Sequence, residues 1–440
     1  MQPPLRVGIA GLGTVGAAVL DILSRRAAQV AGRAGRPVVV TAVSARDRTR
    51  DRGRDLSAYR WFDDPAALAV SDEIDCLVEL IGGEEGPARA AVEAALGAGK
   101  HVVTANKALL AKHGLALAAA AEAKGRALAF EASSAGGIPI VKTLRESLAG
   151  NGIARIYGIL NGTCNYILSR MEQEGSSFAE CLAAAQQLGY AEADPTFDVE
   201  GYDTAHKLAI LTSLAFGSAI DSEAIYVEGI SSITPLDLRM ADELGFRIKL
   251  LGVAERVGDA GIEQRVHPTM VHKTSPVAQV MGVTNAVTVD ADAVGELTLV
   301  GPGAGGSATA SAVVSDIADV AAGTFGAPFG RPVAGLERAE RAPMQRHKGG
   351  YYVRVTVHDR PGVAAGVASR MAEADISLES ILQKRPPGAD RDKLGRSGEP
   401  VPIVLITYEA TEAAIRQALG EMAADGLLAE PPQVIRIERD

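Results

Sequence analysis

The chain has 440 residues, which is too long for one ordinary domain and suggests three domains at roughly 150 residues each. Apolar residues make up 47 % and charged residues 22 %, a profile typical of a globular α/β protein that excludes fibrous and disordered classes. The formal net charge of -10 argues against a nucleic-acid-binding surface, because phosphate contacts need clustered lysine and arginine. The one basic run, Arg46 to Arg54, is interleaved with aspartates and is interpreted as a solvated loop.

The cysteines and the N-terminal residues indicate the compartment. Cys76, Cys164 and Cys181 form neither a CxxC pair nor a ligand-spaced cluster, so neither a disulfide framework nor a zinc site is expected. The first residues lead directly into a strand-like run and lack the pattern of a cleavable signal peptide. No apolar stretch approaches the roughly 18 residues that span a bilayer. These features predict a cytoplasmic protein with no membrane partner.

The first motif in chain order is a glycine-rich turn. Leu5 to Ala10 is a short apolar run, residues 11–16 read Gly-Leu-Gly-Thr-Val-Gly, and helical periodicity continues to Arg25. In this pattern the first glycine permits a tight turn, the second lets backbone approach a pyrophosphate, and the third allows close helix–strand packing. The pattern alone is weak, but its place between a strand and a helix N-terminus favours a dinucleotide site over a merely structural turn. The predicted cofactor contacts are Gly11, Gly13, Thr14, Val15 and Gly16.

The end of the next strand indicates which dinucleotide binds. Pro37 to Val43 is a second apolar run, and a strand at this place usually ends in an acidic residue that binds a free ribose 2′-hydroxyl. This chain has Ser44-Ala45-Arg46 there, and a guanidinium suits a 2′-phosphate. The sequence therefore favours NADPH, with NADH as the alternative cofactor and a plain surface arginine as the alternative interpretation of Arg46.

Further alternating elements extend this first unit. Residues 74–81 and 101–104 read as strands, and residues 87–98 and 109–124 read as helices. Repeated βα units predict a doubly wound parallel sheet, the Rossmann arrangement, in a dinucleotide-binding domain over residues 1–135.

Three polar segments follow predicted strands. Thr104-Ala105-Asn106-Lys107 lies where a strand ends, so Thr104 and Lys107 are candidate cofactor contacts, with a solvated loop lysine as the alternative for Lys107. Residues 131–140 form a small-residue loop that brings backbone close to a partner or binds an ion through its carbonyls. Residues 161–165 precede a helix over 166–174, and local rules do not decide whether their side chains cap that helix or serve a site.

The richest polar segment covers residues 190–207. Asp203 and Lys207 are four residues apart at the start of an apolar helix that runs to Ala215, so they share a face. One interpretation is a surface ion pair worth about 0.2–0.5 kcal/mol. The other is a carboxylate that orients a lysine, which donates a proton to a carbonyl oxygen as hydride reaches the carbon. With Glu192 and Lys107 this set could hold a zwitterionic amino acid, and the residues alone support both interpretations equally.

At these residues the sequence resembles homoserine dehydrogenase, over nearly the whole chain. The motifs that carry the resemblance are the glycine turn, residues 104–107, 136–139 and 161–163, Glu192 with Asp194-Pro195, and residues 201–207 and 301–305. The resemblance implies NADP-linked interconversion of L-aspartate 4-semialdehyde and L-homoserine, in the biosynthesis of threonine, methionine and isoleucine. It also implies that Lys207 donates the proton, that Asp203 and Glu192 bind substrate, and that Lys107 lies beside both cofactor and substrate.

The same resemblance implies a cation and a domain order. A monovalent cation, usually sodium, would bind Glu131 and the carbonyls of Ser134, Gly136 and Ile138. Residues 136–300 would form an α+β substrate-binding and dimerisation domain, which implies a homodimer or homotetramer. Residues 301–325 would return to the nucleotide domain and complete it, with Gly303 as a cofactor contact; a glycine turn before a small-residue helix suits close approach to a phosphate or ribose.

The C-terminal part reads as a separate module. After a connecting segment rich in Gly, Pro and Arg (326–349), residues 350–440 show a βαββαβ pattern, the ferredoxin-like arrangement, with a flexible loop over Arg385–Pro400. With Asp359-Arg360-Pro361-Gly362 between its first strand and helix, the module resembles an ACT domain, a module that binds amino acids. The resemblance implies feedback by L-threonine, and a dimerisation module without a ligand is the alternative.

Two other functions are consistent with the motifs. One is an NADP-dependent dehydrogenase that acts on a different small amino or oxo acid. The other is a redox-sensing protein that uses its nucleotide domain only as a ligand switch. Such a sensor needs neither Lys107 nor the set Glu192, Asp203 and Lys207, and it usually carries a DNA-binding segment, which this sequence does not show.

Overall fold

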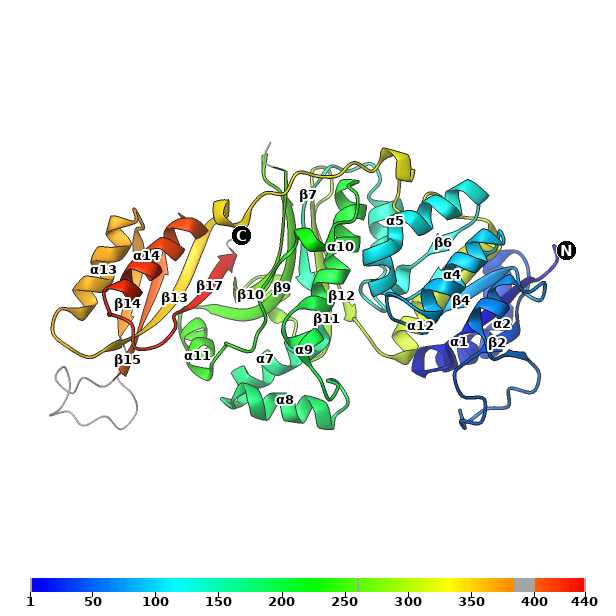
Figure 1. Cartoon of the computed structure of the whole chain (residues 1–440), viewed down its shortest axis with the longest axis horizontal. Helices are drawn as coiled ribbons and strands as arrows, with labels where there is room; N and C mark the ends of the chain where they lie inside the picture. The colour runs from blue at the N-terminus through cyan, green and yellow to red at the C-terminus, as the bar shows by residue number, and fades with distance from the viewer. Residues whose placement is uncertain (1, 259–260, 384–399, 439–440) are drawn as a thin grey trace.

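The computed structural model describes residues 2–258, 261–383 and 400–438, arranged along one long axis with the N-terminal unit at one end and the C-terminal unit at the other (Figure 1). The N-terminal unit contains a six-stranded sheet in the order β3-β2-β1-β4-β5-β6, with parallel pairing throughout. This order is that of a Rossmann fold, so the predicted doubly wound sheet is confirmed. Its strands are β1 (Leu5–Ala10), β2 (Val38–Ser44), β3 (Arg60–Phe62), β4 (Cys76–Glu79), β5 (His101–Thr104) and β6 (Leu128–Ala129).

Helices cover this sheet, and one of them comes from much later in the chain. The helices are α1 (Thr14–Arg25), α2 (Ala27–Ala34), α3 (Pro65–Val70), α4 (Pro87–Gly97), α5 (Lys107–Lys124) and α12 (Gly306–Ala322). Val313 and Ile317 of α12 belong to the same buried cluster as Val7 and Ile9 of β1 and Val19 of α1. The return of α12 therefore completes the core on which the glycine turn rests.

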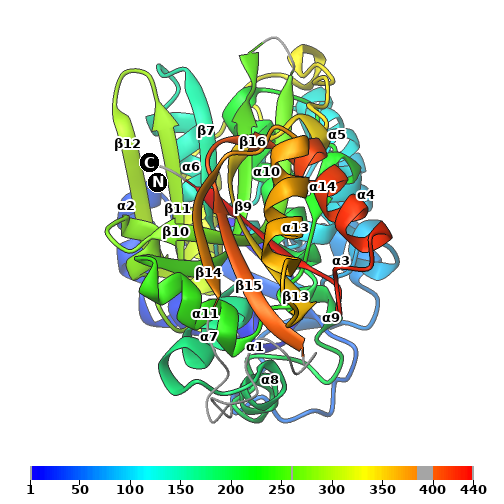
Figure 2. The ribbon, with the colours of Figure 1, turned by 90° about the vertical axis from the view of Figure 1, so that its left-hand side faces the viewer.

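The middle of the molecule is a mixed sheet with helices packed against it (Figure 2). The strands are β7 (Ile153–Ile159), β8 (Tyr226–Val227), β9 (Phe246–Arg256), β10 (Ile262–His272), β11 (Thr284–Ala291) and β12 (Gly295–Pro302). The helices are α6 (Ile140–Lys142), α7 (Gly162–Glu174), α8 (Phe178–Gln187), α9 (Thr196–Val199), α10 (Tyr202–Phe216) and α11 (Pro235–Glu243). Helix α10 is almost wholly apolar after its first two turns and is buried between the mixed sheet and α5.

The C-terminal unit has the predicted βαββαβ order. Its elements are β13 (Lys348–His358), α13 (Val363–Glu373), β14 (Leu378–Gln383), β15 (Pro400–Thr407), α14 (Glu412–Ala424) and β17 (Gln433–Glu438), with a short β16 (Ala410–Thr411). The strands lie in the order β17-β13-β15-β14, which confirms the ferredoxin-like arrangement. The loop predicted over Arg385–Pro400 lies outside the described residues, except for Pro400, which begins β15.

The central and C-terminal sheets are one continuous sheet. β10 pairs in parallel with β17, so that nine strands follow one another in the order β12-β11-β7-β9-β10-β17-β13-β15-β14, and β8 and β16 pair alongside to complete an eleven-stranded sheet. The sequence patterns predicted two separate units, because local patterns carry no information on a pairing between such distant strands. The segment over 326–349 is also held in place, because Glu340 accepts a hydrogen bond from Ile262 and Phe329 is buried against Phe130 with ring centroids 5.1 Å apart.

A buried ion pair supports this junction. Asp237 on α11 is fully buried; its Oδ1 accepts hydrogen bonds from Tyr352 (2.8 Å) and from Arg354 Nε (2.7 Å), both on β13. Its other oxygen accepts from the backbone N–H (3.0 Å) and hydroxyl (2.6 Å) of Thr234 at the start of the same helix. One carboxylate thus holds a helix end of the central unit and a strand of the C-terminal unit. None of the described helices has the length and apolarity needed to cross a membrane.

Replacing Asp237 should loosen the junction. Asp237→Ala leaves the Arg354 guanidinium buried without its counter-charge, which costs about 3–5 kcal/mol of unfolding free energy. The measurement is urea denaturation of the full chain. The matched control is Asp242→Ala on the same helix, whose pair with Lys273 is exposed and should contribute at most about 1 kcal/mol. Equal losses in the two variants would contradict the structural role of Asp237.

Candidate active site

The glycine turn has the geometry that a dinucleotide needs. Gly11 has a φ of +106°, and a Cβ there would lie 2.4 Å from the Leu80 carbonyl oxygen. A Cβ on Gly16 would lie 2.1 Å from the Gly11 carbonyl oxygen, whereas one on Gly13 would meet nothing within 4 Å. Gly13 is the N-cap residue of α1 and has no side chain. The backbone N–H groups of Thr14 and Val15 at the start of the helix are therefore not capped by a side chain. The turn therefore leaves open the one face that a pyrophosphate would occupy.

Loops that sequence analysis considered separately meet beside this turn. A Cβ on Gly306 would lie 2.8 Å from Cγ2 of Thr14, and one on Gly136 would lie 2.3 Å from the Gly303 carbonyl oxygen. Gly303 itself packs on Asn285, whose Nδ2 would be 1.9 Å from an added Cβ. A Cβ at these positions would collide with the neighbouring segment, and the contacts bring the 301–306 loop and the 131–140 loop together next to α1.

Arginines border the turn on the side of β2. Arg46 is exposed two residues after β2 ends. Arg52 lies closer to the turn, because its Nε donates to the Leu12 carbonyl at 3.3 Å and its guanidinium stacks 5.7 Å from the Trp61 ring centroid. Arg52 belongs to the basic run that was interpreted as a solvated loop, and nothing in the sequence distinguishes it from the neighbouring arginines.

The predicted contact Thr104 points into the protein. Its side chain is buried, and its hydroxyl donates to Glu79 Oε2 at 2.6 Å and accepts from the N–H of Asn106 at 3.0 Å. The other oxygen of Glu79 accepts from the N–H groups of Ile81 (2.8 Å) and Gly82 (3.0 Å). This network shapes the carboxyl ends of β4 and β5. Glu79 was missed because a single acid inside an apolar run has no sequence signal for such a role.

The central feature of the site is one carboxylate bound by two lysines. Asp203 Oδ2 accepts from Lys207 Nζ at 2.7 Å, and its Oδ1 pairs with Lys107 Nζ at 2.9 Å. Lys107 is the first residue of α5 in the nucleotide unit, whereas Asp203 and Lys207 lie in the first two turns of α10. Lys207 also donates to the Leu160 carbonyl at 2.7 Å. The side chains of Asp203 and Lys207 are 5 % and 12 % exposed, so this is no surface pair. The pair of Asp203 with Lys107 joins the central unit to the nucleotide unit.

The charges in this cluster reinforce one another. Burial by itself would raise the pKa of the Asp203 carboxyl, but the positive charges of Lys207 and Lys107 outweigh burial and hold that pKa well below its usual value. Burial opposes the charged form of Lys107, yet Asp203, with smaller contributions from Asp198 and Glu192, raises the pKa of that ammonium. At neutral pH the site therefore contains an ionised carboxylate beside a protonated Lys107.

Asn161 both caps the helix that follows it and contacts the site, the two roles between which the sequence alone did not decide. Its Oδ1 caps α7 by accepting from the N–H of Cys164 at 2.8 Å, while its Nδ2 donates to Asp203 Oδ2 at 2.9 Å and to Asp198 Oδ1 at 2.8 Å. Glu192 lies on an exposed loop. Its charge acts on Lys107, but within the described residues no hydrogen bond or ion pair joins the two side chains.

An aromatic contact completes the surroundings of Lys107. Its Nζ lies 5.9 Å from the ring centroid of Phe197, which contacts His206 edge-on with centroids 5.3 Å apart. The Nδ1 atom of His206 is buried and has no hydrogen-bond partner among the described residues. Burial and the nearby Lys107 ammonium lower the pKa of His206, which favours a neutral ring. Sequence analysis did not select His206 within the 201–207 motif.

Comparison with known proteins identifies the family. The profile described as "Homoserine dehydrogenase, NAD binding domain" matches residues 11–131, that described as "Homoserine dehydrogenase" matches 139–318, and the ACT domain profile matches 351–421. A homoserine dehydrogenase of Pseudomonas aeruginosa is 45 % identical, with 99 % of each chain covered. The chain belongs to the homoserine dehydrogenase family. It is therefore an NAD(P)-dependent oxidoreductase with a C-terminal ACT domain.

Solved homoserine dehydrogenases share its fold. The enzyme from Thiobacillus denitrificans superposes with a TM-score of 0.92 at 43 % identity, covering 99 % of this chain and 98 % of that one. A hyperthermophilic archaeal homoserine dehydrogenase solved in complex with NADPH superposes with a TM-score of 0.64 at 26 % identity, covering 74 % of this chain and 100 % of that one.

The residues predicted to hold a cation in this chain are buried together. Glu131, Ser134 and Ile138 are each at most 2 % exposed, and Gly136 has a φ of +56°. The two Glu131 oxygens accept from the N–H groups of Val141 and Lys142 at 2.9 and 2.8 Å. Burial and the nearby negative charge of Asp316 raise the pKa of Glu131 to about 7. The nearby Lys142 ammonium only partly offsets these effects, and a buried acid whose charge is incompletely balanced fits an oxygen-seeking cation.

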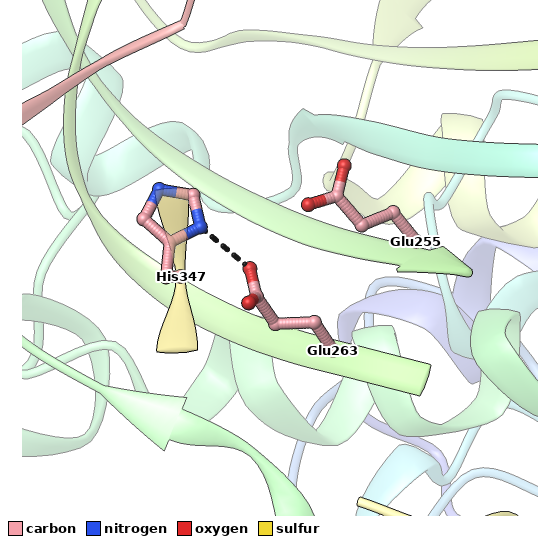
Figure 3. Close-up of side chains that lie close together, drawn as sticks. All are labelled: Glu255, Glu263 and His347. Carbon is pink, nitrogen blue, oxygen red and sulfur yellow. Dashed lines mark hydrogen bonds and ion pairs between the residues drawn. The ribbon is translucent and has the colours of Figure 1, made fainter. Parts of the chain in front are cut away.

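Glu255, Glu263 and His347 also lie close enough together to suggest a metal site (Figure 3). The buried guanidinium of Arg265 already occupies this place, because its Nη1 pairs with Glu263 and, at 2.9 Å, with Glu255. A positive charge is thus already supplied to both carboxylates. We interpret this cluster as part of the junction between β10 and the C-terminal unit and not as a metal centre.

The glycine turn generates a paired test. Gly13→Ala should leave the thermal midpoint unchanged, since its φ of -80° and open surroundings suit alanine, but should weaken NADP+ binding tenfold or more by filling the pyrophosphate face. Gly16→Ala should instead lower the midpoint, because its Cβ meets the Gly11 carbonyl. The measurements are calorimetric titration with NADP+ and thermal unfolding. Normal NADP+ affinity in Gly13→Ala would show that the pyrophosphate lies elsewhere.

Proposed function

We propose that this member of the homoserine dehydrogenase family interconverts L-aspartate 4-semialdehyde and L-homoserine with NADPH as its preferred cofactor, in the biosynthesis of threonine, methionine and isoleucine. The observation that carries the proposal is the Asp203 carboxylate held between Lys207 and Lys107. Two cations and an anion in one buried place, joining the nucleotide unit to the central unit, match a small zwitterionic substrate presented to a cofactor.

In the proposed mechanism, the glycine turn would hold NADPH, which when bound would supply the hydride that reduces the aldehyde carbon. Lys207 supplies the proton to the oxygen that becomes negative, and Asp203 with the Leu160 carbonyl orients the Lys207 ammonium. Lys107 binds the substrate carboxylate or cofactor amide from the other side, and the exposed Glu192 approaches the substrate ammonium from its loop. Positioning and charge stabilisation by these fixed groups lower the barrier.

Removing the proton donor should abolish turnover but not cofactor binding. For Lys207→Ala we expect kcat for homoserine oxidation to fall by about 10²- to 10⁴-fold, the usual contribution of a positioned acid or base. The Kd for NADP+ should stay unchanged, because Lys207 lies on the central unit. Lys112→Ala, which removes an exposed lysine of α5, is the control and should retain activity. Near-normal turnover in Lys207→Ala would show that Lys207 is not the proton donor.

Preference for NADPH is supported by the arginines beside the glycine turn. Arg46 follows β2, and Arg52 contacts the turn itself through the Leu12 carbonyl. Guanidinium groups there suit the 2′-phosphate that distinguishes NADPH from NADH. The archaeal relative solved with NADPH gives further support.

Changing these arginines should alter cofactor preference and little else. In Arg46→Ala/Arg52→Ala, the ratio of kcat/KM with NADP+ to that with NAD+ should fall about tenfold or more, since charge-assisted phosphate contacts are lost. The matched control is Arg50→Ala in the same exposed loop, which should keep the ratio. An unchanged ratio in the double variant would show that other groups select the cofactor.

A sodium ion on Glu131 and the carbonyls of Ser134, Gly136 and Ile138 is the second part of the proposal. It would stabilise the contact between the 131–140 and 301–306 loops. Sodium chloride should therefore raise the thermal midpoint above that in choline chloride at equal ionic strength, and Glu131→Gln should remove most of the difference. No difference between the salts in the unaltered chain would argue against the cation.

The units divide the work in this proposal. Residues 1–135 with 301–325 bind the dinucleotide, residues 136–300 bind substrate and form the subunit contact, residues 326–349 connect, and residues 350–440 regulate, with L-threonine as effector.

The exposed edge strand β12 suits pairing with a second copy, which supports a homodimer or homotetramer. The three free, buried cysteines fit a reducing cytoplasm. The alternative, a C-terminal unit without a ligand, would leave the enzyme insensitive to threonine.

A further inference from the structure

A buried carboxylate outside the lysine cluster connects the glycine turn to Lys107. Glu79, at the end of β4, is fully buried, and no ammonium or guanidinium pairs with it within the described residues. Its hydrogen bonds come from uncharged donors, namely the backbone N–H groups of Ile81 and Gly82 and the hydroxyl of Thr104. Because burying an acid without a counter-charge lowers the free energy of unfolding, stability alone gives no reason for a carboxylate at this place.

The first link runs from Glu79 to the glycine turn. Leu80, the next residue, donates its N–H to the Ala10 carbonyl at 2.7 Å, and its own carbonyl oxygen would lie 2.4 Å from a Cβ on Gly11. Glu79 Oε1 accepts from the N–H groups of the two residues after Leu80, at 2.8 and 3.0 Å. The carboxylate therefore fixes the backbone segment that lies directly against the glycine turn.

The second link runs from Glu79 to Lys107. Glu79 Oε2 accepts from the Thr104 hydroxyl at 2.6 Å, and the oxygen of that hydroxyl accepts from the N–H of Asn106 at 3.0 Å. Because a carboxylate only accepts hydrogen bonds, Glu79 directs the Thr104 hydrogen toward itself and leaves the hydroxyl oxygen free for Asn106. Asn106 caps α5, whose first residue is Lys107, and its amide donates to the Gly83 carbonyl at 2.7 Å. The loops after β4 and β5 are thus tied to each other.

We infer that Glu79 is a positioning residue, which fixes the Lys107 ammonium relative to the glycine turn. Through the two links, one carboxylate sets the separation between the turn that would hold the cofactor and the ammonium that pairs with Asp203. This separation matters because a displacement of about 1 Å can lower turnover about a hundredfold. The inference deepens the proposed function and rests on it for the part that Lys107 plays in binding substrate.

The experiment cuts the second link without removing a lysine. Thr104→Val keeps the size of the side chain but removes the hydroxyl, so kcat/KM for homoserine should fall about tenfold or more, and Thr104→Ser should restore most of it. Glu79→Gln should show the same loss, because its amide nitrogen cannot accept from Thr104. The matched control is Thr41→Val, which removes a hydroxyl that donates to the Glu73 carbonyl at 2.7 Å in the same unit. It should keep kcat/KM, even where it lowers the thermal midpoint as much as Thr104→Val does.

A double-mutant cycle tests whether the effect passes through Lys107. Added to Lys107→Ala, Thr104→Val should lower kcat/KM by less than about twofold, because the group that Glu79 positions is already absent. The cycle is repeated by titrating L-homoserine into enzyme saturated with NADPH, since this pair cannot exchange hydride and the comparison holds even where turnover is lost. A merely structural role would give equal losses in the two backgrounds.

Equal losses in the two backgrounds would overturn the inference, and so would normal kcat/KM in Thr104→Val. Normal kcat/KM in Glu79→Gln, or no recovery in Thr104→Ser, would show that the bond between these two side chains does not position Lys107. An equal loss in Thr41→Val would indicate general loosening of the nucleotide unit. Absence of homoserine oxidation in the unaltered chain would count against the proposed function, whereas normal oxidation in the chain and in the Glu79 and Thr104 variants would count against this inference alone.

Discussion

The architecture of the site depends on the contact between the Asp203 carboxylate and the two lysines from different domains. Lys107 reaches Asp203 from the first residue of α5, at the carboxyl edge of the nucleotide sheet, and Lys207 reaches it from the next turn of α10. Burying the Asp203 carboxylate with a single counter-charge would lower the free energy of unfolding. Without this carboxylate, the ammonium groups of Lys107 and Lys207 would repel each other. Under the proposed function, this interface would provide the charges that a zwitterionic substrate and a developing alkoxide require. The same three side chains would then serve both structural stability and chemistry.

The second constraint is the continuous sheet from β12 to β14. Because β10 and β17 hydrogen-bond directly, the ACT domain cannot be regarded as a module on a flexible tether (Figure 1). Arg265, Arg436 and Asp237 form buried ion pairs across the junction. Removing the ACT domain would therefore expose a strand edge and leave these charges without their partners. Point substitutions at the junction are thus the appropriate way to study regulation.

Much of the fold could be predicted because the local signals were strong. The glycine turn, the alternating βα units and the βαββαβ order each follow from patterns within a few tens of residues. What could not be predicted is long-range: the pairing of β10 with β17, the packing of the 326–349 segment, and the burial of Arg265 and Arg436, which look like ordinary surface charges in a sequence. For the site, the i,i+4 spacing of Asp203 and Lys207 put them on one face, but only the structure adds Lys107 as the second ligand of Asp203. It also shows that Asn161 both caps α7 and binds Asp203, and that the Thr104 hydroxyl points to Glu79.

The most direct test is a crystal structure of the full chain with NADP+ and L-homoserine bound. The account predicts that Lys207 Nζ lies within about 3.2 Å of the substrate hydroxyl oxygen, with Asp203 still joining Lys207 to Lys107 and the nicotinamide ring facing the carbon that carries that hydroxyl. If homoserine binds elsewhere, and Lys207 contacts only Asp203 and the Leu160 carbonyl, this lysine is a structural tie and the proposed chemistry is wrong.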